Sequence, residues 1–331
     1  MHGVLNVLKP PGMTSHDAVA FVRRVLQTKR VGHTGTLDPA AAGVLPICVG
    51  QATRLVEYLQ SGTKEYIAEM TFGFETDTCD AVGKTISEGD ASSVNLETLR
   101  ATLDSFHGEI TQTPPLFSAI KKDGKKLYDL AREGFSDGEI EIPTRQVVIS
   151  DLRITQFFPD ENQIEKRPRA ILKIECSGGT YIRSLVRDIG RVLGCGATMT
   201  FLVRNRNGAF AIRDASTLEE IASNWQNALL PMGGVLGWCA HQIVEDDDAI
   251  AAFAHGKVSS LNHLKSQLKE YAEGSDAHKM RRTKAWQSGH GASTPHIAVI
   301  NQSKTQAAIA SPVEGEVTLY KPDKVFFFDT D

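Results

Sequence analysis

The alternation of apolar and polar residues predicts strands and helices in mixed order along the chain. Alternation with a period of two predicts extended segments, which are residues 3–8, 64–74, 143–158, 170–176 and 201–213. Apolar residues at helical spacing predict helices, which are residues 14–27, 52–59, 95–106, 180–193 and 218–227. Helices and strands do not alternate regularly. We therefore expect an α+β fold with a mixed, largely antiparallel central sheet flanked by helices.

The length of the chain predicts two domains. With 331 residues the chain exceeds the usual size of a single hydrophobic core. The Pro-Met-Gly-Gly segment at residues 231–234 is typical of a linker. We therefore expect one domain at 1–232 and a smaller β-rich one at 238–331, with strands at 296–300, 307–310, 316–320 and 324–328. Residues 257–291 are long and polar and are expected to form an atypical insertion in the second domain.

Composition indicates a soluble intracellular protein. Hydrophobic residues make up 41% and charged residues 23% of the chain, and no apolar run reaches the length of a membrane helix. The N-terminus lacks the basic-then-apolar pattern of a signal peptide. The five cysteines are odd in number and widely spaced, which is typical of reduced thiols. We expect a cytoplasmic protein.

Charge gives a weaker indication of the binding partner. The net charge of −4 argues mildly against nucleic acid, but binding requires only one basic face. Residues 121–132 contain five basic and two acidic side chains, a local charge of +3. Taken alone, a run of this kind is more often solvated surface than a phosphate-binding site.

Asp38 stands in a loop of unusual composition, Gly-His-Thr-Gly-Thr-Leu-Asp-Pro at residues 32–39. Pro39 disfavours helical geometry at Asp38, and the apolar run at residues 44–49 would anchor the far end of the loop. A carboxylate on such a rigid loop could be a nucleophile. It could also cap a turn.

Three other interpretations of this loop fit less well. A phosphate-binding loop requires Lys followed by Ser or Thr after its second glycine, and here Thr36 and Leu37 follow. In the phosphorylated aspartate of ion pumps the acidic residue precedes the Thr-Gly-Thr run, whereas here it follows. A metal site would need more ligands than the nearest histidines, His16 and His33, supply. We therefore expect no metal.

Arg183 is the second residue of interest. It falls in the first turn of a predicted helix, where the helix dipole disfavours a cation by about 0.3–1 kcal/mol. A buried carboxylate beside Arg183 would offset this cost. Arg187 and Arg191 follow at helical spacing and would form a basic stripe. The alternative is a solvent-facing helix whose arginines pair locally with Asp188.

Several segments together resemble the bacterial TruB-type tRNA pseudouridine synthases. Their order and approximate spacing match that family over residues 3 to about 232. The matching segments are residues 6–15, 32–46, 64–66, 76–80, 114–121, 124–128, 179–183 and 193–197.

The resemblance implies the pseudouridine synthase fold with a small C-terminal PUA-like domain, and an isomerase that needs no cofactor. Such an enzyme would convert uridine 55 in the T arm of tRNA to pseudouridine. Asp38 takes the position of the nucleophile and Tyr66 that of the aromatic residue that stacks on the target base. Arg183 takes the position of the partner of the catalytic carboxylate. His33 would insert where the flipped nucleotide leaves the stack, and Leu202 would pack against the base.

The resemblance also implies how RNA is bound. Residues 111–142 would form an insertion that clamps RNA. The expected substrate-binding residues in the matching segments are Lys9, Asp80, Lys121, Lys125 and Lys126. We expect a monomer that binds tRNA without a protein partner. Two alternatives stay open: a non-catalytic RNA-binding or tRNA-folding protein on the same scaffold, and a guide-RNA-dependent enzyme acting on ribosomal RNA.

Overall fold

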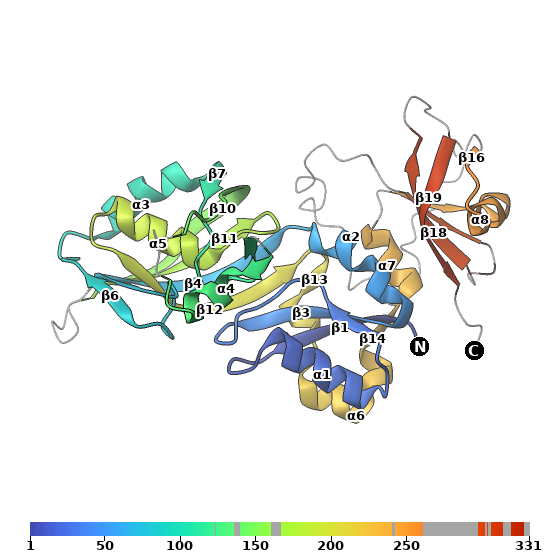
Figure 1. Cartoon of the computed structure of the whole chain (residues 1–331), viewed down its shortest axis with the longest axis horizontal. Coiled ribbons are helices and arrows are strands. Elements are labelled where there is room, and N and C mark those ends of the chain that lie inside the picture. The colour runs from blue at the N-terminus through green and yellow to red at the C-terminus, as the bar shows by residue number, and fades with distance from the viewer. Residues whose placement is uncertain are drawn as a thin grey trace. The chain divides into compact units, whose positions relative to one another are not determined.

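The structure is a computed structural model, and the chain divides into two compact units. It describes residues 1–122, 124–135, 140–159, 167–239, 242–260, 297–301, 303, 306–313 and 319–327. Unit 1 comprises Met1–Pro39, Gly43–Gly62 and Asn207–Asp331, and unit 2 comprises Ala40–Ala42 and Thr63–Arg206. Figure 1 shows the elements of both units.

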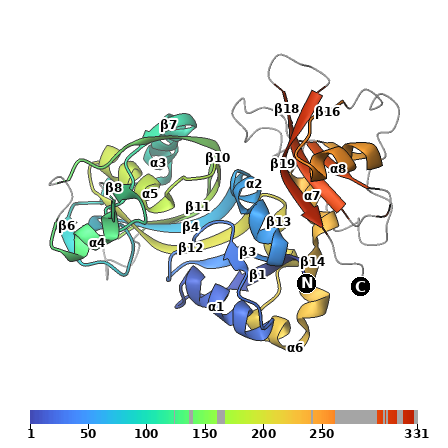
Figure 2. The ribbon, with the colours of Figure 1, turned by 45° about the vertical axis from the view of Figure 1, so that its right-hand side comes forward.

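The first part of unit 1 is built around strand β1 (Gly3–Lys9). It pairs antiparallel with β3 (Ala42–Val49) and with β14 (Leu229–Pro231), and β2 (Val31–His33) pairs with β3. Helices α1 (Ser15–Val25) and α6 (Leu218–Ala228) lie side by side next to β1, as Figure 1 and Figure 2 show. Both helices begin with a capping box, closed by Thr14 in α1 and by Thr217 in α6.

The second part of unit 1 is a five-stranded sheet with the order β15-β17-β18-β19-β16. The bounds of its strands and of the helix beside them are β15 (Gln242–Glu245), α8 (Asp247–Ala254), β16 (Ser259–Ser260), β17 (Ile297–Ile300), β18 (Gln306–Pro312) and β19 (Leu319–Phe327). Only β15 and β17 pair in parallel. This sheet agrees with the expected β-rich C-terminal part. The described residues of the strands predicted at 316–320 and 324–328 belong to one strand, β19, with a register shift near Pro322.

The linker predicted at residues 231–234 is wrong. Pro231 ends β14, and helix α7 (Met232–Cys239) begins at the next residue. Met232 and Leu236 are buried in one cluster with Leu55 and with Ala298 of β17. Burial of these apolar side chains outweighs the helix-breaking tendency of the two glycines. The domain limits at 232 and 238 stay a prediction. Most of the insertion predicted at 257–291 lies outside the described residues.

Unit 2 contains a long sheet with the order β12-β4-β11-β10-β7. The pairs from β4 to β7 are all antiparallel. The bounds of its strands are β4 (Lys64–Phe72), β7 (Gly108–Gln112), β10 (Arg145–Phe158), β11 (Arg169–Cys176) and β12 (Ala197–Asn207). Two hairpins accompany this sheet: β5 (Phe74–Thr76) with β6 (Thr85–Glu88), and β8 (Lys121–Lys122) with β9 (Lys125–Lys126).

Helices pack on the sheet of unit 2. Helix α3 (Leu96–Leu103) packs on β10, and α5 (Ile182–Val192) packs on β4 and on α3 (Figure 1). Gly190 of α5 permits close approach to β12, because a Cβ atom there would lie 2.2 Å from the backbone nitrogen of Ala197. The remaining short elements are η1 (Gly50–Leu55), α2 (Val56–Gln60), η2 (Asp104–Phe106), α4 (Leu127–Arg132), β13 (Phe210–Ala211) and η3 (Ile212–Asp214).

The α+β prediction is confirmed, with local corrections. The helix predicted over 180–193 begins two residues later, because α5 begins at Ile182 and the Thr180 hydroxyl donates to the carbonyl of Ser177 at 3.0 Å. The extended segment predicted over 201–213 ends at Asn207 and is followed by short elements. In the part of the chain that the structure describes, no helix combines the length and apolar character needed to cross a membrane.

Candidate active site

The loop that carries Asp38 is held by the start of α1. The Ser15 hydroxyl accepts a hydrogen bond from the Leu37 N–H at 2.8 Å and donates one to the Leu37 carbonyl at 2.9 Å. Leu37 is only 3% exposed, so both bonds lie in the interior. The residue directly before Asp38 is thus fixed on both sides of its backbone, while Asp38 itself is half-buried. A carboxylate on such a support has a defined position.

Lys9 holds the other side of this loop. Its side chain is fully buried, and its ammonium donates to the carbonyls of Pro10 at 2.9 Å, Met13 at 2.7 Å and Pro39 at 3.4 Å. The carbonyl of Pro39 also accepts from the Gly12 N–H at 2.8 Å. The ammonium of Lys9 thus contacts the loop backbone, and the binding of substrate by Lys9 stays a prediction. Lys9 supports the residue that follows Asp38.

The beginning of the loop is fixed by Asn207. Thr34 is fully buried, and its N–H donates to the carbonyl of Pro46. The side-chain amide of Asn207 donates to the Thr34 hydroxyl at 3.2 Å and to the Thr34 carbonyl at 3.3 Å. His33 is half-buried, and its Nδ1 accepts from the Gly35 N–H at 3.3 Å. The sequence pattern contained no signal for the role of Asn207, since its partner lies 173 positions away.

In unit 2, Arg183 occupies a buried position at the start of α5. It is 5% exposed, and its guanidinium donates to the carbonyls of Thr78 at 2.9 Å and Phe117 at 3.1 Å. Its Nε lies 3.8 Å from Oδ2 of Asp80. The buried carboxylate expected beside Arg183 is therefore present in Asp80. The pairing of Arg183 with Asp38 stays a prediction.

Asp80 is itself oriented by local hydrogen bonds. Its Oδ1 accepts from the Thr78 hydroxyl at 2.6 Å and from the Val82 N–H at 3.1 Å. Cys79, directly before it, adopts a φ of 60°, which is unusual for a residue other than glycine. This tight turn brings both the Thr78 carbonyl and the Asp80 carboxylate to Arg183. Asp80, which was predicted to bind substrate, thus lies beside the predicted partner of the nucleophile.

The arginine stripe on α5 is not an exposed basic face. Arg187 is buried and donates to Asp188 at 2.9 Å and to the carbonyl of Thr113 at 3.0 Å. Arg191 pairs with Glu75 at 2.9 Å. The Arg187–Asp188 pair agrees with the alternative in which the arginines of the helix pair locally. That alternative also expected a solvent-facing helix, which is wrong for Arg183 and Arg187 because both are buried.

Tyr66 and Leu202 lie on neighbouring strands of the sheet in unit 2. Tyr66 belongs to the buried face of β4 together with Ala68, Met70 and Phe72, as the alternation predicted. Leu202 is buried on β12, the strand next to β4. Their roles toward a nucleotide base stay predictions.

The buried end of β4 carries a lysine with a lowered pKa. Lys64 lies opposite Cys176 of β11, and both side chains are buried. Burial, reinforced by the nearby charge of Arg204, lowers the pKa of Lys64 to about 8. Burial raises the pKa of the Cys176 thiol to about 11, so this thiol stays protonated at neutral pH. Lys64 and Tyr66 project to the same face of β4, because they are two residues apart.

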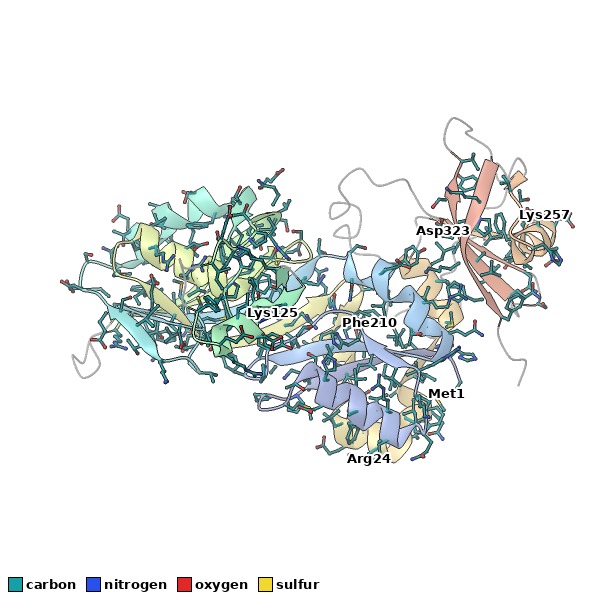
Figure 3. All side chains as sticks on the ribbon, viewed as in Figure 1. Met1, Arg24, Lys125, Phe210, Lys257 and Asp323 are labelled. Atoms are coloured by element: carbon teal, nitrogen blue, oxygen red, sulfur yellow. The ribbon has the colours of Figure 1, made fainter. Side chains whose placement is uncertain are left out.

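The lysine cluster forms the β8–β9 hairpin. Lys121 pairs with Lys126 and Lys122 with Lys125 along the backbone. Lys125, labelled in Figure 3, makes a surface ion pair of 3.0 Å with Glu133, and Lys122 donates to the carbonyl of Glu141 at 2.7 Å. The side chains of Lys121 and Lys126 lie outside the described part of the structure. An exposed pair such as Lys125–Glu133 contributes little stability, so it leaves the lysine available to another anion.

Among the described residues, no group of three or more His, Cys, Asp and Glu side chains has the geometry to hold a metal ion.

Comparison with sequence families defines the class of the protein. Residues 23–182 match the family described as TruB family pseudouridylate synthase (N terminal domain). Residues 183–241 match the tRNA pseudouridylate synthase B C-terminal domain. The crystal structure of a Cbf5-Nop10-Gar1 complex is similar, with a TM-score of 0.66 at 25% identity, over 98% of this chain and 85% of that chain. The fold is thus that of a pseudouridine synthase.

Individual relatives narrow the class further. The tRNA pseudouridine synthase B of Symbiobacterium thermophilum is 51% identical over 235 residues, which are 71% of this chain and 76% of the relative. That of Alkaliphilus oremlandii is 48% identical over 247 residues, covering 74% and 79%. The chain belongs to the TruB family of tRNA pseudouridine synthases, and it is an isomerase that acts on tRNA.

Proposed function

We propose that this enzyme isomerises uridine 55 in the T arm of tRNA and that Asp38 is its nucleophile. In this reaction the N1–C1′ bond breaks, the uracil turns, and C5 bonds to C1′. C5 loses its proton and N1 gains one, so the nucleotide keeps its atomic composition. No oxidant, reductant or added group is required.

The support of the Asp38 loop is the observation that carries this proposal. Leu37 is fixed by Ser15 on both sides of its backbone, and Pro39 is fixed by Lys9. A nucleophile must approach a carbon atom in one geometry, and a small misplacement costs a large part of the rate. The hydrogen bonds to residues 37 and 39 hold residue 38 in a defined position, as a nucleophile requires. A carboxylate that only caps a turn would not need them.

The other site residues are given roles that fit their environments. Arg183 would act as the cationic partner of the Asp38 carboxylate, the role that its place in the matching segment implies. Tyr66 would stack on the flipped base, and Leu202 would pack against it. Flipping a base out of an RNA stack costs a few kcal/mol, and stacking on an aromatic ring returns roughly 1–3 kcal/mol of that cost. His33 would occupy the space that the nucleotide leaves.

The position of modification can be tested directly. We expect the enzyme to form one pseudouridine in an unmodified tRNA transcript, at residue 55, and none in a transcript with cytidine at that position. Chemical mapping of pseudouridine in both transcripts measures this. A transcript with cytidine 55 that is modified elsewhere at a similar rate would contradict the assignment.

We also propose that the β8–β9 hairpin binds tRNA phosphates. Replacing Lys121, Lys122, Lys125 and Lys126 by glutamate is expected to weaken tRNA binding and to flatten its salt dependence. Each lost phosphate contact should reduce the slope of log K against log salt by about 0.7–0.9. Filter binding at several salt concentrations measures this slope. Arg153→Glu, an exposed position on β10, serves as the matched control. An unchanged slope in the hairpin variant would make the hairpin ordinary surface.

A further inference from the structure

A short segment of unit 2 is fixed to α5 at several points. The side-chain amide of Gln112 donates to the Tyr181 carbonyl at 3.0 Å, and its oxygen accepts from the Tyr181 N–H at 2.7 Å. The next carbonyl, that of Thr113, accepts from the hydroxyl of Ser184 at 2.8 Å. These contacts tie the segment that follows β7 to the first turn of α5, which is the turn that carries Arg183.

The same segment contacts Arg183 directly and then continues into Ser118. The carbonyl of Phe117 accepts from the Arg183 guanidinium at 3.1 Å. Ser118 follows, and its backbone is satisfied on both sides: its N–H donates to the carbonyl of Leu116 at 2.9 Å, and its carbonyl accepts from the Tyr128 N–H at 3.1 Å. The position of Ser118 is therefore defined by the chain, one residue away from a direct contact of Arg183.

The Ser118 hydroxyl lacks a partner. The residue is 5% exposed, and its Oγ has no hydrogen-bond partner among the described residues. Buried polar atoms in folded proteins are almost always hydrogen-bonded, because leaving one unpaired is unfavourable. A hydroxyl can donate one hydrogen bond and accept two. An unpaired hydroxyl on a rigid support beside Arg183 is suited to bind a group that is not part of the chain.

We propose that the Ser118 hydroxyl hydrogen-bonds the polar edge of the flipped uracil. This inference rests on the proposed base-flipping reaction. The phosphates of an RNA stay at the protein surface, whereas a flipped base enters an enclosed pocket and is read there by hydrogen bonds to its edge. Ser118 is 5% exposed and its Oγ is buried, so this hydroxyl is matched to a base and not to a phosphate. Uracil presents two carbonyl oxygens and an N3–H, and a serine hydroxyl can serve any of them.

We expect Ser118→Ala to lower the activity without lowering the stability. Because the hydroxyl is unpaired in the free enzyme, its removal is expected to leave the thermal midpoint unchanged or slightly raised. The value of kcat/KM for tRNA should fall about 3- to 10-fold, the range that one neutral hydrogen bond supplies. Ser184→Ala is the matched control, because that buried hydroxyl is paired with Thr113 and its loss should lower the midpoint. A Ser118→Ala variant with a lowered midpoint, or with unchanged kcat/KM, would overturn the proposal.

A second measurement distinguishes a base contact from a backbone contact. Binding of a tRNA transcript with uridine 55 is compared with binding of one that is abasic at that position. Ser118→Ala is expected to weaken binding of the uridine transcript 3- to 10-fold and to leave the abasic one unchanged. Equal weakening of both would overturn the base assignment. If chemical mapping finds no pseudouridine at residue 55, the proposed position of modification fails instead, and the two failures remain distinguishable.

Discussion

Asp38→Asn is expected to abolish pseudouridine formation, with a loss in rate of at least about a thousandfold, while tRNA affinity changes by less than about threefold. The amide has nearly the shape of the carboxylate, but it carries no charge and is a very weak nucleophile. The supporting bonds from Ser15 and Lys9 go to the backbone of Leu37 and Pro39, so the substitution leaves them in place. We therefore expect this variant to lose the reaction but to keep its affinity for tRNA.

Tritium release from tRNA labelled at C5 of uridine measures the chemical step, and filter binding measures the affinity. Asp104→Asn, which changes an exposed carboxylate in η2, is the control and should behave as the wild type. An Asp38→Asn enzyme with wild-type tritium release would exclude Asp38 as the nucleophile. An enzyme that loses binding together with activity would instead assign Asp38 to substrate binding.

The second large effect is expected for Ser15→Ala. The substitution removes both hydrogen bonds to Leu37 and leaves its buried N–H and carbonyl unpaired, which should lower the free energy of unfolding by about 1–3 kcal/mol. The loop would then sample positions in which Asp38 no longer points toward the reacting carbon. We expect kcat to fall about 10- to 100-fold with a smaller change in KM, since the loss concerns orientation.

Urea unfolding and steady-state kinetics measure the two effects. Ser105→Ala removes an exposed hydroxyl that donates to the Thr102 carbonyl, and it should change neither quantity appreciably. If Ser15→Ala lowers stability but keeps the wild-type kcat, the support of the loop would be structural only. That outcome would remove the observation on which the nucleophile proposal depends.

Much of the fold could be predicted from local patterns. The alternation in β4 placed Tyr66, Ala68 and Met70 on the buried face, and the apolar stripe of α1 identified its packed side. These predictions succeed because a strand or helix has a fixed period, so residues near in sequence report which face is buried. The linker at 231–234 failed because composition alone does not reveal that Met232 packs in a shared core with Ala298.

In the candidate site, too, some residues could be predicted from local sequence and others could not. Asp38 and Arg183 could be singled out, one from loop composition and one from its unfavourable place at a helix start. The support residues could not. The sequence suggested that Lys9 binds substrate and gave no sign of its contacts with the loop backbone. Ser15 and Ser118 were included only as members of the matching segments 6–15 and 114–121.

The order of residues along this chain was sufficient to identify its periodic elements, its candidate nucleophile loop and its family, because each of these is encoded over short distances. The tertiary structure alone determined how the candidate site residues are held. Ser15 lies 22 positions from Leu37, and Arg183 lies 105 positions from Thr78 and 66 from Phe117. Such hydrogen bonds join a side chain to a backbone group, and a backbone carbonyl or N–H is chemically alike at nearly every residue. No pattern of residue types can therefore reveal which one is the partner.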